Sequence, residues 1–433
     1  MMHDNCSRSF KSFDNHNHFS RFFREWLMRA FSQLRRGGFL CAYVLFLLAA
    51  LPSVGAAQTI ARCGKGWLEL VDGYPVLHLK GSHYEMGYQH GALFKEHIRQ
   101  NMDNILVKRA EQTIDVGGFL KVKPRVVIDM ITRIQEKYVP QKYYDELRGL
   151  AAGSDLKYAD AVAGNFLPEL FHCSGFAIMN SATKDGTLYH GRVLDYMVDW
   201  ELQNHAVVIV AEPDGGIPFV NVTYAGFIGS VTGMNAKSIS VGEMGGRGLG
   251  HWGGVPMAFL VREVLERGGD LDEAIAIFRD TPRTCQYFYV VADGKTNRAV
   301  GMEASWDKFQ LIKPGESNPL LPTPVQDAVL LSAGDRYKEL VKRTEAGHGA
   351  FDADSARSLM DCPVAMKSNL HDVLFAPQST KFWIANASKD KQPAATQKYF
   401  AFQLTELLAR TPEMSSPEIP LVALRAVTAQ PKE

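Results

Sequence analysis

The stretch FHCSGFAIMNSATKDGTLYHGRVLDY, residues 171–196, decides the fold of this chain. It holds two strand-like runs, SGFAIMN and TLYHGRVL, and between them a turn that ends in Asp-Gly. An Asp-Gly turn between apolar runs predicts an antiparallel β-hairpin. Cys173 stands immediately before the first strand, and Arg192 and Asp195 end the second. The hairpin is therefore expected to bring Arg192 and Asp195 back towards Cys173.

These three residues suggest a nucleophile of a particular kind. If the bond between His172 and Cys173 is cut, Cys173 becomes a chain terminus whose α-amine lies next to its own thiol. A free α-amine has a pKa near 8 and can accept a proton at neutral pH. The Arg192 charge would favour the thiolate, because a nearby cation lowers the pKa of a thiol. Asp195 would orient the guanidinium and the new amine through hydrogen bonds.

Outward from this hairpin, strand-like runs and helical segments alternate in groups. Further hairpins are predicted at 66–80, turning at Asp72-Gly73, and at 286–304. Helices are predicted over about 81–106, 124–150, 158–170, 255–268 and 270–280, the last capped by Asp270. Gly87 and Gly91, one turn apart, predict close packing of their helix against another backbone. This order indicates an α+β fold with mainly antiparallel sheets flanked by helices.

The composition excludes several classes of function. Lys plus Arg and Asp plus Glu number 47 each in 433 residues, so no basic surface for nucleic acid is indicated. The glycine-rich stretch GEMGGRGLGHWGG, residues 242–254, lacks the GK[ST] ending of a phosphate loop. We interpret that stretch as a flexible loop near the active site, and a lid is one interpretation of it.

The first 57 residues are expected to be a leader. The run GFLCAYVLFLLAAL, residues 38–51, follows three arginines and precedes small residues that end at Ala57. A basic segment, a short apolar segment and a small-residue exit are typical of a secretory signal peptide. Met28 would start a signal of ordinary length. The alternative is an uncleaved membrane anchor, although the run is short of the roughly 20 residues that span a bilayer.

The quoted hairpin resembles a known family. It is similar to the nucleophile region of N-terminal-nucleophile (Ntn) hydrolases related to isopenicillin-N acyltransferase, also described as acyl-coenzyme A:6-aminopenicillanic acid acyltransferase. Bile-salt hydrolases and acid ceramidases are more distant members with a similar Cys…Gly-Arg-x-x-Asp hairpin. The stretches GSHYEMGYQHG, DELRGLAAG, GFIGSVTGMNAKSISV and SNLHDVLFAPQSTKFWIA extend the resemblance from about Gly66 to Leu408.

The resemblance implies a four-layer αββα sandwich and a precursor that cleaves itself before the nucleophile. The family's nucleophile falls on Cys173, and its Arg/Asp pair falls on Arg192 and Asp195. Cleavage between His172 and Cys173 would leave a mainly helical α chain, residues 58–172, associated with a catalytic β chain, residues 173–433. His172 departs from the small or acidic residue expected before the nucleophile.

The residues that stabilise the oxyanion are less clearly marked. Two asparagines of the bile-salt branch fall on Gly245 and on the region of Ser332 and Ala333, where this chain has no asparagine. Candidate replacements are Asn235, Asn369 and backbone N–H groups. For Asn235 a turn is favoured over an oxyanion role, because Gly-Met-Asn between strands suits turn geometry.

Other candidate residues have a structural and a functional interpretation. Glu243 is a candidate pocket residue. Tyr196, Trp200, Tyr224, Phe227 and Trp252 are candidates for an acyl pocket, although core packing is the default for each. His371 is expected to be structural, and Cys285 and Cys362 are expected to lie in the core.

No metal or organic cofactor is expected. His78, His83, His90 and His97 lack the i, i+4 spacing that places two ligands on one helix face, and no HExxH motif occurs. The sequence therefore offers no metal-ligand motif of this kind.

We expect an exported, self-cleaving cysteine amidase or acyltransferase that acts through an acyl-thioester on Cys173. The expected partner is a small amide or acyl substrate, with a lipid-like substrate and peripheral membrane contact as variants. Nucleic acid is not an expected partner. The alternatives are a phospholipase-like or ceramidase-like lipid hydrolase on the same fold, and a catalytically silent binding protein.

Overall fold

The computed structural model describes residues 57–116, 120–166, 173–196, 198–246 and 250–422. The leader, His172 and part of the glycine-rich stretch lie outside these residues. The described chain from Ala57 onwards forms one compact unit. No helix among the described residues is both long and apolar enough to cross a membrane.

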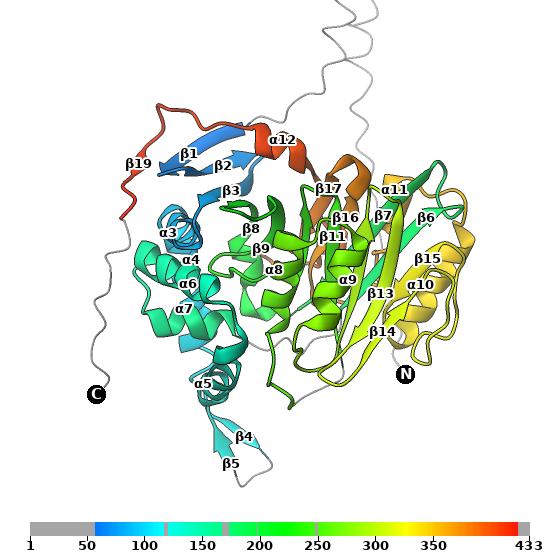
Figure 1. Ribbon diagram of the computed structural model, residues 1–433, viewed down its shortest axis with the longest axis horizontal. Helices are drawn as coiled ribbons and strands as arrows, with labels where there is room; N and C mark the ends of the chain where they lie inside the picture. Colours follow the sequence, from blue (N-terminus) through cyan, green and yellow to red (C-terminus); the bar gives the residue numbers. More distant parts are fainter. Residues whose placement is uncertain (1–56, 117–119, 167–172, 197, 247–249, 423–433) are drawn as a thin grey trace, which may run out of the picture. The chain divides into compact units, whose positions relative to one another are not determined.

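The largest sheet formed by the described residues has eleven strands, mostly antiparallel (Figure 1). In sheet order they are β14 (Phe309–Ile312), β13 (Arg298–Ala304), β12 (Tyr287–Asp293), β11 (Ile239–Gly245), β10 (Thr232–Asn235), β9 (Phe219–Tyr224), β8 (Ala206–Pro213), β3 (Tyr74–Gly81), β2 (Gly66–Val71), β1 (Ala57–Cys63) and β19 (Glu418–Ile419). Only β3–β8 and β1–β19 pair in parallel within this sheet. The segment before Cys173 thus supplies three strands to the same sheet as the segment after it.

The smaller sheet has six strands and contains the hairpin that follows Cys173. Its order is β15 (Ala328–Leu331), β6 (Ser174–Asn180), β7 (Gly186–Asp195), β16 (Asn369–Ala376), β17 (Lys381–Asn386) and β18 (Phe400–Gln403). Every pairing in it is antiparallel. A separate two-stranded ribbon is formed by β4 (Ile114–Val116) and β5 (Leu120–Val122).

Helices cover the outer faces of the two packed sheets. The helices are α3 (His83–Leu93), α4 (Lys95–Met102), α5 (Pro124–Gln135), α6 (Gln141–Ser154), α7 (Tyr158–Asn165), α8 (Met257–Arg267), α9 (Leu271–Asp280), α10 (Gly334–Ala346), α11 (Ala353–Ser358) and α12 (Leu404–Ala409). Helices α8 and α9 contact the large sheet, whereas α10 and α11 contact the small one. Strands β6 and β7 in turn face β11 and β12 across the core. The predicted αββα layering, mainly antiparallel, is confirmed.

Local chemistry explains most of the elements that the sequence predicts. Asp72 and Gly73 both take positive φ, as the tight turn between β2 and β3 requires. The Asp270 side chain accepts a hydrogen bond from the Glu273 N–H and caps α9. The predicted helix over 81–106 is divided into α3, α4 and a π-helical turn, Asp103–Val107.

The two glycines of α3 pack as predicted, against α6. A Cβ on Gly87 would lie 1.9 Å from the Glu146 carbonyl oxygen, and one on Gly91 would lie 2.5 Å from that of Leu150. Gly149 of α6 approaches the α3 backbone in the same way. The two helices thus meet backbone to backbone, a contact that no larger residue permits. In Figure 1 they lie side by side.

Candidate active site

Cys173 directly precedes β6, and the register of the hairpin fixes its neighbours on β7. Ser174 pairs with Val193, and Gly175 pairs with Arg192. Because opposite residues of a pair share a face, Arg192 lies on the face of Gly175. Gly175 carries no side chain, and the Met244 side chain of β11 packs where its Cβ would lie, with the sulfur 2.6 Å from that position. Cys173 and Gly175 are two residues apart and therefore share a face. Arg192, opposite Gly175, lies on the same face as Cys173.

Cys173 lines a cavity between the two sheets, and its residue surface is 5% exposed. The other lining residues come from the end of β11, from β12 and from the segments before and after β15: Met244, Gly245, Gly246, Phe288, Leu320, Leu321, Ser332, Ala333 and Gly334. The last three lead into the first turn of α10. The thiol therefore lies beside a space that a small molecule can enter.

Arg192 forms a buried ion pair with Glu243 on β11. Its Nε donates to the Glu243 carbonyl oxygen at 3.0 Å, and its Nη2 donates to Oε2 at 3.3 Å. Both side chains are fully buried. A buried guanidinium requires such a partner, because an unpaired charge there is strongly unfavourable. Glu243 directly precedes Met244, so the pair lies next to the wall of the Cys173 cavity.

Asp195 is held by groups outside the hairpin. One carboxylate oxygen accepts the Met366 N–H at 2.9 Å, and the other accepts from Arg336 Nη1. Burial raises the pKa of Asp195 to about 6, although the Arg336 and Arg192 charges and the Met366 hydrogen bond act in the opposite direction. We expected Asp195 to orient Arg192 directly; the hydrogen bonds described here place Glu243 on Arg192 and Arg336 on Asp195.

Arg336 is a residue that the sequence reasoning missed. It lies in the first turn of α10, 141 positions from Asp195 in the sequence. It also donates to the Val364 carbonyl oxygen at 3.2 Å, two residues before Met366. An arginine at the start of a helix gives no signal in the sequence that distinguishes it from an exposed one.

Asn235, a candidate oxyanion donor, is fully engaged in a turn. Its amide donates to the carbonyl oxygens of Leu265, at 3.1 Å, and Gly268, at 2.8 Å. Its side-chain oxygen accepts from the backbone N–H groups of Lys237 and Ile239. The side chain thus joins the β10–β11 turn to the end of α8, and Asn235 does not line the Cys173 cavity.

Asn369, the second candidate donor, is also engaged. Its amide donates to an Asp372 carboxylate oxygen at 2.8 Å and to the Leu194 carbonyl at 3.3 Å. Its oxygen accepts the Ala395 N–H at 2.8 Å. Burial raises the pKa of Asp372 well above its usual range. Backbone N–H groups are the third candidate source of donors. Residues 332–334 line the cavity, so their backbone lies there.

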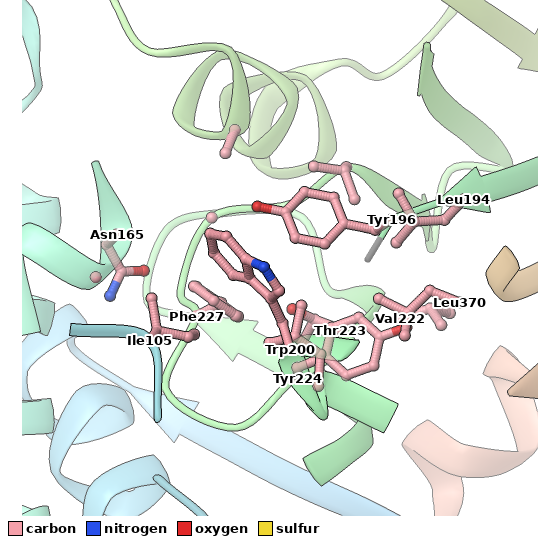
Figure 2. A pocket seen from close by; sticks show the side chains of 15 residues that line it. Ile105, Asn165, Leu194, Tyr196, Trp200, Val222, Thr223, Tyr224, Phe227 and Leu370 are labelled. Atoms are coloured by element: carbon pink, nitrogen blue, oxygen red, sulfur yellow. The ribbon is translucent and has the colours of Figure 1, made fainter. Parts of the chain in front are cut away.

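Tyr196 lines a second, largely apolar pocket beside the same end of β7 (Figure 2). Its ring meets the Trp200 ring edge to face, with centroids 5.8 Å apart. Four of the five aromatic residues singled out in the sequence line this pocket: Tyr196, Trp200, Tyr224 and Phe227. Trp252 lines a neighbouring pocket instead. Figure 2 shows the Trp200 ring between Tyr196 and Phe227.

Two polar side chains of this apolar pocket, Asn165 and Tyr224, have partners in the surrounding protein. The Asn165 amide donates to the carbonyl oxygens of Ala161 and Gly226, and its oxygen accepts the Ile228 N–H. The Tyr224 hydroxyl is 3.0 Å from His371 Nδ1. With these groups engaged, the pocket offers a bound molecule mainly hydrocarbon and aromatic surface.

His371 is a buried histidine between the sheets. Its Nε2 lies 3.0 Å from the Thr232 hydroxyl, and its Nδ1 faces Tyr224. Burial, with a smaller contribution from Arg192, lowers the pKa of His371 well below its usual value. The ring is therefore neutral and hydrogen-bonded on both sides, as a structural histidine is.

Two further features bear on the sequence expectations. Within the described residues, no cluster of three His, Cys, Asp or Glu side chains is arranged to hold a metal ion. Cys63, Cys173, Cys285 and Cys362 are all free thiols. Of the predicted glycine-rich loop, residues 242–245 belong to β11, and 247–249 lie outside the described part of the chain.

Comparisons with known proteins bear on this geometry. The family described as acyl-coenzyme A:6-aminopenicillanic acid acyl-transferase matches residues 181–318. The Dictyostelium discoideum protein dcd1B is 25% identical over 386 residues, or 79% of this chain and 76% of that protein. The N-acylethanolamine-hydrolyzing acid amidase of Rattus norvegicus is 26% identical over 201 residues, or 43% of this chain. The match spans about half, 53%, of the length of the rat amidase.

Among solved structures, the Caenorhabditis elegans ortholog of N-acylethanolamine-hydrolyzing acid amidase is similar with a TM-score of 0.40 and 20% identity. That match covers 48% of this chain and 93% of the other. The αββα assignment above does not depend on it. The predicted relationship to the acyl-coenzyme A:6-aminopenicillanic acid acyltransferase family of Ntn hydrolases is confirmed, and residues 181–318 carry it.

Proposed function

We propose that this protein is a cysteine amidase or acyltransferase whose nucleophile is Cys173, made N-terminal by cleavage of the bond after His172. One observation carries the proposal: Cys173 directly precedes a β-strand and lines a cavity, and Arg192 lies on the adjoining strand, on the face leading back to it. A core cysteine has no need of either feature. The family relationship supports the same reaction class.

In the proposed reaction, the Cys173 thiolate attacks the amide carbonyl of the substrate. The α-amine of Cys173 takes the thiol proton and passes it to the leaving amine, so that the C–N bond breaks and an acyl-thioester forms. Water or another amine then takes the acyl group and restores the thiol. The buried Arg192 charge favours the thiolate. Ionised Asp195 receives a hydrogen bond from the α-ammonium group.

Backbone N–H groups are the proposed donors to the oxyanion. The amides of Asn235 and Asn369 are already donated to other acceptors. The segment 332–334 lines the cavity with Cys173 and occupies the region where an asparagine of the bile-salt branch would fall. One oxyanion donor contributes about 2.7–4 kcal/mol to transition-state stabilisation, so a backbone replacement matters for the rate.

The acyl part of the substrate is proposed to be apolar. The pocket around Tyr196 and Trp200 lies beside the end of β7 and presents mainly aromatic and aliphatic surface. This pocket favours a lipid-like amide over a polar one. The rat relative's name, an N-acylethanolamine-hydrolyzing acid amidase, points to the same class of substrate.

Export and chain association belong to the same proposal. The segment 1–57 would direct the protein out of the cytoplasm and be removed, or would anchor it. Residues 58–172 and 173–433 would remain associated after cleavage, because strands β1–β3 of the first part lie between β8 and β19 of the second within one sheet. Peripheral contact with a membrane would give access to a lipid-like substrate.

Hydrolysis of a series of fatty-acyl amides of increasing chain length tests this proposal. We expect turnover to rise from acetyl to long-chain amides, to vanish in Cys173→Ala, and to lose its chain-length preference in Trp200→Ala. Gln286→Ala is a matched control, because Gln286 is a partly buried side chain bonded to Glu303 and lines neither pocket. Absence of turnover together with a Cys173 that fails to react with iodoacetamide would support the catalytically silent binding protein instead.

A further inference from the structure

The position of the Asp195 carboxylate depends on elements remote in sequence. On β7 it lies two residues beyond Val193, the partner of Ser174, and therefore at the end of the hairpin where Cys173 begins. The α-amine released by cleavage would appear at this end. Whether Asp195 can receive it depends on what holds the carboxylate and keeps it charged.

Three segments meet at the Asp195 carboxylate: β7, which carries it, α10 and residues 364–366. Arg336 of α10 donates to one oxygen, and the Met366 N–H donates to the other. Arg336 also donates to the Val364 carbonyl oxygen at 3.2 Å, which fixes the segment that presents Met366. Arg336 thus contacts the Asp195 carboxylate directly. Through Val364 it also fixes the segment whose Met366 N–H donates to the other carboxylate oxygen.

The surrounding charges make this cation necessary. The Asp195 side chain is fully buried, and Arg336 is only slightly exposed. Arg192 on β7 acts on Asp195 as a second positive charge, and burial together with the Asp195 charge raises the pKa of the neighbouring Asp372 carboxyl on β16. Arg192 is itself engaged by Glu243. Arg336 is therefore the charge that contacts Asp195 through a side-chain hydrogen bond.

The same turn of α10 also borders the nucleophile. Ala333 and Gly334, which begin the helix, line the cavity with Cys173, and Arg336 follows two residues later. One helical turn therefore supplies both a wall of the cavity and the anchor of Asp195.

We propose that Arg336 is a positioning residue of this site, fixing the Asp195 carboxylate where the α-amine of Cys173 is released. The inference rests on the proposed function. Arg336 contacts neither the substrate nor the thiol in this account. It acts through Asp195, by orientation and by keeping that carboxylate charged.

The test compares full-length Arg336→Gln and Arg336→Lys with wild type and with Arg343→Gln. Arg343 is a matched control, since it lies on the same helix and donates to carbonyls of residues 358, 361 and 362 without touching Asp195. We expect the acidic limb of kcat/KM for a long-chain acyl amide to move to higher pH by about 1 unit or more in Arg336→Gln. Arg336→Lys is expected to restore part of that shift, and Arg343→Gln to leave the limb in place. An unmoved limb in Arg336→Gln would overturn the inference.

A second readout does not depend on activity. The pH dependence of Tm reports Asp195 directly, because this group is harder to ionise in the folded than in the unfolded chain. Arg336→Gln should extend the loss of Tm with rising pH to higher pH, and in an Asp195→Asn background it should not. If wild type neither turns over amides nor is cleaved, the proposed function fails while this comparison still decides the Arg336–Asp195 contact. Equal slopes in all four proteins would overturn that contact.

Discussion

At the scale of single residues, the site contains two buried carboxylates in different settings. Glu243 faces Arg192 across the gap between the sheets, and Asp195 faces Arg336 on the outer side of the small sheet. Each cation neutralises a different acid. Arg192 and Asp195 are three residues apart on β7. Because residues at an odd spacing on a strand point to opposite faces, their side chains contact different partners.

Removal of Glu243 is predicted to be costly. Glu243→Ala leaves the Arg192 guanidinium buried without its carboxylate, and the expected loss is about 3–5 kcal/mol in the free energy of unfolding. Urea denaturation at pH 7 measures it. Glu303→Ala is a comparison, because Glu303 is also buried but pairs with the half-exposed Lys308. Equal, small losses in both variants would contradict a structural ion pair at Glu243.

The Asp195 carboxyl predicts how stability depends on pH. Its folded pKa, about 6, is above the ordinary value near 3.9, so the folded state binds this proton more tightly. The contribution is fully present below about pH 4 and is lost as pH rises through about 6, amounting to about 2–3 kcal/mol. Asp195→Asn should remove that part of the slope in urea denaturation between pH 4 and pH 7. An unchanged slope would show that Asp195 is ionised as easily as in the unfolded chain.

Individual residues were predictable from the sequence to different degrees. Cys173 was marked by its place before a hairpin, and four pocket aromatics by their clustering after it. Glu243 as the partner of Arg192, and Arg336 and Met366 as partners of Asp195, were not predictable. These contacts depend on how one sheet packs on the other and where α10 begins, and local spacing does not encode either.

At the scale of elements, the pairing of α3 with α6 depends on glycine. The sequence pointed to Gly87 and Gly91, but not to Gly149 and Gly153, because a partner helix is identified only by its packing. The β2–β3 turn and the α9 cap were predictable, since each is decided by neighbours in sequence. The division of 81–106 at Phe94 was not.

Gly87→Ala is predicted to destabilise the protein by several kcal/mol. The new Cβ would lie 1.9 Å from the Glu146 carbonyl oxygen, so the two helices must separate. Gly164→Ala on α7 is the matched control, because its Cβ would meet the flexible end of Met102, at 2.4 Å, and otherwise Leu106 at an ordinary contact distance of 3.9 Å. Thermal unfolding of both variants measures the difference. If Gly87→Ala were no worse than Gly164→Ala, the close packing of α3 on α6 would be contradicted.

At the scale of the whole molecule, the parts before and after Cys173 share a sheet. Strand β3 lies between β2 and β8 and pairs with the latter in parallel, and β1 pairs with β19 near the end of the described chain. The sequence predicted the αββα layering and the antiparallel direction of most strand pairs. It did not predict these two parallel contacts, which join segments far apart in the chain.

This shared sheet predicts that cleavage does not release either part. After cleavage, residues 58–172 and 173–433 should elute together in native size-exclusion chromatography and separate only under denaturing conditions. Separation of the two fragments without denaturant would contradict the continuity of the large sheet across β3 and β8.

The central claim, that Cys173 becomes a chain terminus, is tested most directly by intact-mass spectrometry of the purified protein beside Cys173→Ala. The account predicts two fragments that meet between residues 172 and 173 in the wild type and one uncut chain in the variant. An uncut wild-type chain would contradict cleavage at Cys173.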